Sequence, residues 1–181
     1  MKRLTGLVSL AALLAFAGTA EAQHRELQRR GYLGFGGGLG VPSGQFGADA
    51  NLGWVGQAYA GYTTRKGLFG ARLDATFGRN PFGTVGGFWT AGGTVNAIIT
   101  PGHRPASFHP YLIAGAGAYY VDATGPASSG ETAVAFNGGA GVQLHLGHRS
   151  DFYAETRFLT IRTERAVNLF PITLGFRWGG I

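Results

Sequence analysis

The chain has 181 residues, of which 33 are glycine, 13% are aromatic and only 13% are charged. Soluble domains usually have about a quarter charged residues and about 7% glycine. The many apolar residues exclude a disordered chain, and the irregular glycine spacing excludes collagen. The absence of cysteine excludes disulfides, thiol nucleophiles and thiolate metal sites. The net charge of +6 does not indicate nucleic-acid binding, because lysine and arginine form no cluster interleaved with aromatic residues.

The first residues have the pattern of a secretory signal peptide. Two basic residues at positions 2 and 3 precede an apolar run over 7–16, and residues 20–22 (AEA) form a small-x-small cleavage site. We therefore expect residues 1–22 to be removed on export and residues 23–30 to form a periplasmic N-terminal tail. A membrane anchor is disfavoured, because the apolar run falls short of the ~20 residues that a spanning helix needs.

From residue 31 onward, apolar residues recur at every second position, which is the pattern of a β-strand with one apolar face. Near the end of the chain this apolar series consists of Phe170, Ile172, Leu174, Phe176 and Trp178. Thr173, Gly175 and Arg177 lie between its members. The same alternation predicts eight strands, over 31–41, 52–62, 68–78, 88–100, 110–121, 133–146, 152–161 and 168–178.

These eight segments favour a membrane barrel over a soluble one. An even number of ~10-residue strands of alternating polarity is typical of outer-membrane barrels, in which a closed sheet satisfies every backbone hydrogen bond. The charged strand residues fall opposite the large apolar side chains, and an arginine facing lipid would cost about 2–4 kcal/mol. We predict an all-β fold, a transmembrane eight-stranded antiparallel up-and-down β-barrel over 31–181, with a small and polar interior. A soluble lipocalin-like carrier with an apolar interior is the alternative.

The connections between the segments alternate in length. Those over 63–67 and 147–151 are short, whereas those over 42–51, 79–87 and 122–132 are longer. Two connections depart from this alternation, 101–109 being long and 162–167 short. Short periplasmic turns and longer outer loops follow if both ends of the barrel chain face the periplasm.

Five segments together resemble the OmpA-like outer-membrane β-barrel domain family. They are GYLGFGGGLGVP, LFGARLDATFG, HPYLIAGAGAYYV, FYAETRF and the ending FPITLGFRW. The resemblance covers nearly all of the chain after the signal peptide and implies a monomeric eight-stranded barrel in outer-membrane lipid. It also implies insertion by the barrel assembly machinery, which reads an aromatic-ended last strand. Phe176 and Trp178 match that assembly signal, and Gly179, Gly180 and Ile181 follow it.

Five charged residues on the polar face form the main candidate site: Arg72, Asp74, Glu155, Arg157 and Arg177. In a barrel of eight strands the third and seventh face each other across an interior that side chains just fill. A buried charge must be paired, so we expect a salt-bridged network that plugs the lumen. A binding constellation or a pore lining is the alternative. The strand glycines are expected to leave room for inward side chains from opposite strands.

Aromatic residues near the strand ends are expected to form girdles at the membrane interfaces. They are Tyr32, Trp54, Tyr62, Trp89, Tyr111, Tyr120, Phe152, Phe170 and Trp178.

The sequence contains no recognised catalytic motif. Dinucleotide-binding, P-loop, HExxH and GxSxG patterns are all absent. His103, His109 and His148 fall in predicted turns, and His145 falls on the polar face of the sixth segment. We therefore expect no enzyme activity, no cofactor and no metal. The remaining functions are a structural or surface-interaction barrel, a narrow pore for small solutes, and an adhesin or ligand-binding barrel acting through its outer loops.

Overall fold

A computed structural model of the chain describes residues 31–64, 67–82, 86–101, 107–124, 130–147, 149–164 and 166–179. These ranges contain β1 (Gly31–Ser43), α3 (Phe46–Asp49), β2 (Gly53–Thr63), β3 (Phe69–Pro81), β4 (Gly87–Ile99), β5 (Phe108–Thr124), β6 (Glu131–Gly147), β7 (Ser150–Ile161) and β8 (Val167–Gly179). Within them, no helix is long and apolar enough to cross a membrane. The expected signal peptide and N-terminal tail lie outside the described residues.

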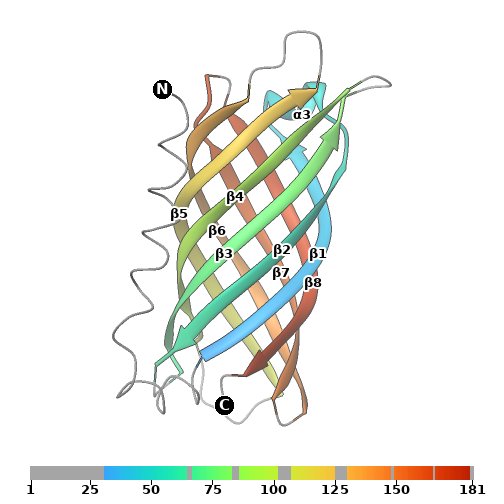
Figure 1. Cartoon of the computed structure of the whole chain (residues 1–181). Helices are drawn as coiled ribbons and strands as arrows, with labels where there is room; N and C mark the ends of the chain where they lie inside the picture. The colour runs from blue at the N-terminus through green and yellow to red at the C-terminus, as the bar shows by residue number, and fades with distance from the viewer. Residues whose placement is uncertain are drawn as a thin grey trace.

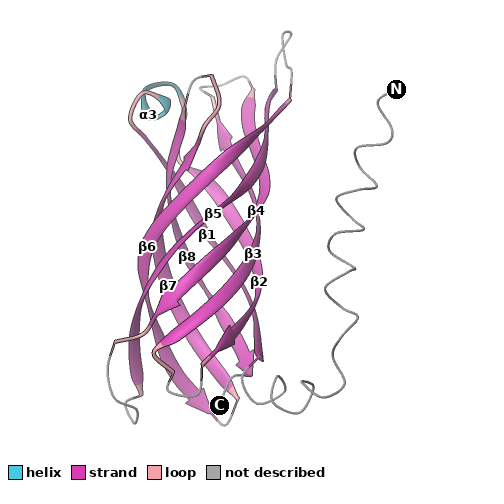
Figure 2. Ribbon diagram, turned by 90° about the vertical axis from the view of Figure 1, so that its left-hand side faces the viewer, coloured by secondary structure: helices cyan, strands magenta, loops and turns pink. Residues whose placement is uncertain are grey.

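The eight strands form one closed barrel in which each strand pairs with its neighbours in the chain. All of the pairings are antiparallel, and β8 returns to pair with β1 through partners such as Tyr32 with Gly179 and Gly40 with Pro171. Figures 1 and 2 show the tilted strands arranged around one barrel axis. The predicted eight-stranded antiparallel up-and-down barrel is confirmed, and each predicted segment corresponds to one strand.

The outward faces of the strands carry large apolar side chains. Leu33, Phe35, Val95 and Leu174 each expose more than half of their surface. An exposed apolar surface that continues around a protein is unfavourable in water, whereas the outer band of a membrane barrel faces hydrocarbon. The apolar face of each strand that the alternation predicts is therefore the outward face.

The girdle prediction is wrong for two of its aromatic residues. Tyr32 and Tyr111 are almost fully buried and lie inside the barrel. Their sequence positions share the parity of the inward residues, so nearness to a strand end does not decide which face a ring occupies. Trp54, Tyr120 and Trp178 are exposed and point outward, as expected.

Inward glycines make room for the buried tyrosine rings. A Cβ atom added to Gly34 would overlap the Tyr59 ring, and one added to Gly61 would overlap the Tyr32 ring. Each of these glycines is paired in register with the tyrosine that lies over it. For these two glycines the ring comes from the neighbouring strand and not from the opposite side of the barrel. A Cβ atom added to Gly36 would instead overlap the Tyr153 hydroxyl, which comes from β7, beyond β8 in the barrel.

The two ends of the barrel differ. We call them the α3 end, where α3 and the connections β1–β2, β3–β4, β5–β6 and β7–β8 lie, and the terminal end, where β1 begins and β8 ends (Figure 1). At the α3 end the interior holds an apolar cluster of Phe88, Tyr119, Val121, Ala133, Ala135, Leu159, Ile161, Val167 and Leu169. The prediction of a polar interior is thus wrong for this end, because both faces of the strands become apolar there.

Candidate functional site: the interior charge cluster

Four charged side chains meet inside the barrel between β3 and β7. Arg72 Nη2 lies 2.8 Å from Glu155 Oε2, and Arg157 Nη1 lies 3.2 Å from Asp74 Oδ2. On its own strand, Arg72 Nε lies 2.9 Å from Asp74 Oδ1. Arg157 Nη2 likewise lies 2.6 Å from Glu155 Oε1. We call these four residues the charge cluster.

The charge cluster has no net charge and is shielded from solvent. Its two guanidinium groups face two carboxylates, and none of the four side chains exposes more than 8% of its surface. At such buried positions each charge is stabilised by the opposite charges beside it, because hydration by water is weak. The cluster crosses the lumen because β3 and β7 lie on opposite sides of the barrel (Figure 1).

Neutral polar side chains add further hydrogen bonds to the charge cluster. The Tyr111 hydroxyl donates to Glu155 Oε2 at 2.7 Å, and Asn96 Nδ2 donates to Asp74 Oδ2. Arg157 Nη2 donates to the Gln57 side-chain oxygen at 3.4 Å. The carboxylates therefore accept bonds from β4 and β5 as well as from the arginines, which ties five strands to one network.

A second pairing set lies nearer the terminal end and contains Arg177. Arg177 Nε lies 3.2 Å from Asp151 Oδ2, its Nη1 donates to Gln143 at 2.8 Å, and its guanidinium lies 4.2 Å from the centre of the Tyr32 ring. Asp151 also lies 2.9 Å from His145 Nδ1.

The structure thus corrects the grouping of Arg177 with the other four charges. In the β7–β8 register, Arg177 is opposite Asp151, whereas Thr173 is opposite Glu155. Four residues along a strand correspond to about 13 Å, which separates Arg177 from the charge cluster. Asp151, the counter-charge of Arg177, lies at the start of β7, within the connection that the sequence predicts over 147–151.

The lumen is filled on both sides of the charge cluster. Toward the α3 end lies the apolar cluster, and between the two clusters the structure leaves a cavity of about 10 Å³ beside Thr76, Tyr119 and Asn137. A space of that size holds a single water at most. Toward the terminal end, Tyr32, Tyr59 and Tyr153 pack together. The arrangement can hold strands together, with buried side chains packed on both sides of the charge cluster.

The neutral members of the network are not among the site residues predicted from the sequence. Gln57, Asn96 and Asn137 are buried, and Asn137 donates to Asn96 at 2.8 Å. The signal for them was present, because each lies on the polar face of its strand. Tyr111 was missed because it was assigned to an interface girdle.

The predicted assembly-signal residues lie on the outward face of β8. Phe176 and Trp178 are both exposed. The Phe176 ring lies 5.7 Å from Phe152 on β7, and the Trp178 ring lies 4.9 Å from Phe35 on β1. They therefore contact both neighbours of the strand that closes the barrel. Gly180 and Ile181 lie outside the described residues.

The histidines do not form a metal centre in the described part of the chain. His109 and His145 lie in β5 and β6, and no group of three or more potential metal ligands occurs among the described residues. His103 and His148 lie outside them.

These features define a class of protein. A closed eight-stranded barrel with an apolar outer face and paired charges inside is built for a bilayer, because a soluble barrel would have the reverse polarity. The comparison with family profiles makes the assignment specific. The chain belongs to the outer membrane protein beta-barrel domain family, whose profile matches residues 9–177. The protein is therefore an outer-membrane barrel.

Solved structures of three outer-membrane proteins share this fold. Neisserial surface protein A (NspA) is 19% identical with a TM-score of 0.70, over 82% of this chain and 96% of that chain. The N-terminal β-barrel domain of Pseudomonas aeruginosa OprF is 16% identical with a TM-score of 0.54, over 83% and 98%. Ail, the attachment invasion locus protein of Yersinia pestis, is 14% identical with a TM-score of 0.54, over 83% and 99%.

At these identities the likeness shows the fold alone. The resemblance to OmpA-like barrels inferred from the sequence is confirmed by the family match and by the OprF domain. A search of curated proteins found no match.

Proposed function

We propose that this protein is a structural or surface-interaction barrel of the outer membrane, without catalytic activity and with a lumen closed to ions. The observation that carries the proposal is the balanced charge cluster, whose side chains are almost fully buried and bonded across the lumen. An open pore would keep such groups hydrated, as polar channel linings are.

The apolar cluster forms a second barrier to ions, between the charge cluster and the α3 end. A constriction lined by Leu159, Ile161 and Leu169 resists wetting, and a hydrophobic constriction is one of the ways in which pores are closed. Loss of the charges alone is therefore not expected to open the barrel.

The proposal includes the route to the membrane. Export uses residues 1–22, residues 23–30 form a periplasmic tail, and the barrel assembly machinery inserts a monomer with the α3 end outside. The α3 end then presents the loops to the surroundings of the cell. Ail, which shares the fold, is named the attachment invasion locus protein, and that name motivates the surface-interaction part of the proposal.

Single-channel recording on the refolded barrel in planar bilayers tests the closed lumen. We expect no conductance steps from the wild type, and none from Arg72→Ala combined with Glu155→Ala, because the apolar cluster remains. A known porin in the same bilayers serves as the positive control. Steady wild-type conductance would reject the closed lumen in favour of a narrow channel for small solutes.

A further inference from the structure

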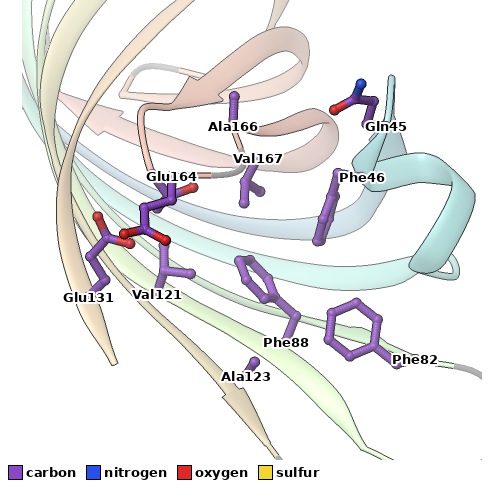
Figure 3. Close-up of a pocket in the computed structure, with 11 residues that line it drawn as sticks. Gln45, Phe46, Phe82, Phe88, Val121, Ala123, Glu131, Glu164, Ala166 and Val167 are labelled. Carbon is purple, nitrogen blue, oxygen red and sulfur yellow. The ribbon is translucent and has the colours of Figure 1, made fainter. Parts of the chain in front are cut away.

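The α3 end of the barrel contains a pocket of about 610 Å³. Its lining residues come from α3 and the residue before it, from β4, β5, β6 and β8, and from the connections β3–β4 and β7–β8. Figure 3 shows them around the pocket. Phe88, Val121 and Val167 belong both to this pocket and to the apolar cluster, so the cluster closes its floor. The rim residues Gln45 and Ala166 are exposed. The volume of the pocket lies within the ~300–1,000 Å³ of small-molecule sites.

One side of the pocket is aromatic. The Phe46 ring lies 4.8 Å from Phe88 and 6.3 Å from Phe82, and Phe82 lies 6.1 Å from Phe88. Phe46 and Phe82 are only partly buried, and they line the pocket at the barrel end, apart from the outward band that faces lipid. Apolar surface left open in such a place indicates a binding site, and ring faces attract cations as well as apolar groups.

The other side of the pocket is acidic. Glu131 begins β6 and Glu164 lies in the β7–β8 connection, and both are exposed. Figure 3 shows their carboxylates on the same side of the pocket, opposite the Phe46 and Phe82 rings. Among the described residues neither carboxylate has an ion-pair partner. Two carboxylates on one wall repel each other and favour a cation between them.

We propose that this pocket binds an organic cation that has an aromatic or other apolar body and one ammonium group. The body lies among Phe46, Phe82 and Phe88, and the ammonium lies beside Glu131 and Glu164. The inference is independent of the function proposed above, because the pocket is the same whether the lumen below its floor conducts or not.

Three water-soluble probes with one body and different charge test the proposal: 4-phenylbutylammonium, 4-phenylbutanol and 4-phenylbutyrate. The whole barrel is placed in lipid nanodiscs and titrated while methyl NMR signals of Val121 and Val167 are followed, with empty nanodiscs as the blank for lipid partitioning. We expect saturable shifts at both valines and a Kd for the cation at least tenfold lower than for the anion. The preference should shrink as salt is raised, because the carboxylates are exposed.

Two variants distinguish the contribution of the carboxylates to binding from that of the pocket itself. Glu131→Gln with Glu164→Gln should weaken binding of the cation by about fivefold, as expected for two exposed ion pairs, and should leave binding of 4-phenylbutanol unchanged. Ala123→Trp, which fills the pocket from β5, should abolish binding of all three probes. An unchanged NMR spectrum outside the pocket shows that each variant is folded.

Equal affinity for the cation and the anion would overturn the proposal, as would the absence of saturable shifts at Val121 and Val167. Cation binding that survives the double glutamine variant undiminished would also reject it. None of these results bears on conductance, so failure here is distinguishable from failure of the closed-lumen proposal.

Discussion

Replacing Glu155 by glutamine should destabilise the barrel strongly, because it leaves two buried arginines with one counter-charge. Glu155 accepts hydrogen bonds from Arg72 at 2.8 Å, from Arg157 at 2.7 Å and from Tyr111 at 2.7 Å. Glutamine keeps the size of the side chain but removes its charge. Breaking a buried pair by neutralising one partner typically costs about 3–5 kcal/mol, and solvent screening is weak here because the carboxylate side chain is 1% exposed.

Urea unfolding of the protein in lipid vesicles measures this effect. With a denaturant slope of roughly 2 kcal/mol per molar urea, the midpoint should fall by about 1.5–2.5 M. Glu131→Gln is the matched control, since the same substitution at an exposed carboxylate should move the midpoint by less than about 0.5 M.

The double variant Arg72→Met with Glu155→Gln distinguishes charge balance from packing. It removes one charge of each sign, so the remaining Arg157 and Asp74 still form a pair at 3.2 Å. We expect it to be more stable than Glu155→Gln alone, because it leaves no buried charge without a counter-charge. If Glu155→Gln is no less stable than Glu131→Gln, or if the double variant is the least stable of the three, the reasoning from charge pairing is refuted.

Three further outcomes are expected. Phe176→Ala with Trp178→Ala should lower the yield in the outer membrane and increase degradation in the periplasm, because the two rings contact both strands that flank the closing strand; equal yields by cell fractionation would contradict it. Gly141→Ala should lower the urea midpoint, since its Cβ would overlap an inward tyrosine ring, whereas Gly138→Ala, which has open space around it, should not; equal midpoints would contradict the packing argument. N-terminal sequencing of protein from the outer membrane should begin at Gln23, and a start at position 1 would contradict the predicted cleavage.

Much of the barrel could be predicted from the sequence because strand geometry is local. Successive side chains point to opposite faces, so the alternation along 168–178 already separates Leu174 and Phe176 from Thr173 and Arg177. The cost of an arginine in lipid then identifies the inward face. The strand segments and the inward position of the charges follow from these two rules, and the antiparallel pairing follows from the known architecture of outer-membrane barrels.

The sequence alone determined that this chain forms an eight-stranded outer-membrane barrel with charges inside, and the tertiary structure decided which charges pair. Which charges pair depends on the register between neighbouring strands. The alternation of side chains does not fix this register, because a shift by two residues keeps every side chain on the same face. The register of β7 with β8 brings Arg177 to Asp151 and leaves Glu155 for Arg72. Strand register also placed the inward Tyr32 and Tyr111 rings over glycines of neighbouring strands. The pocket at the α3 end joins α3, β6 and the β7–β8 connection. These segments are distant in sequence and come together only when β8 closes on β1.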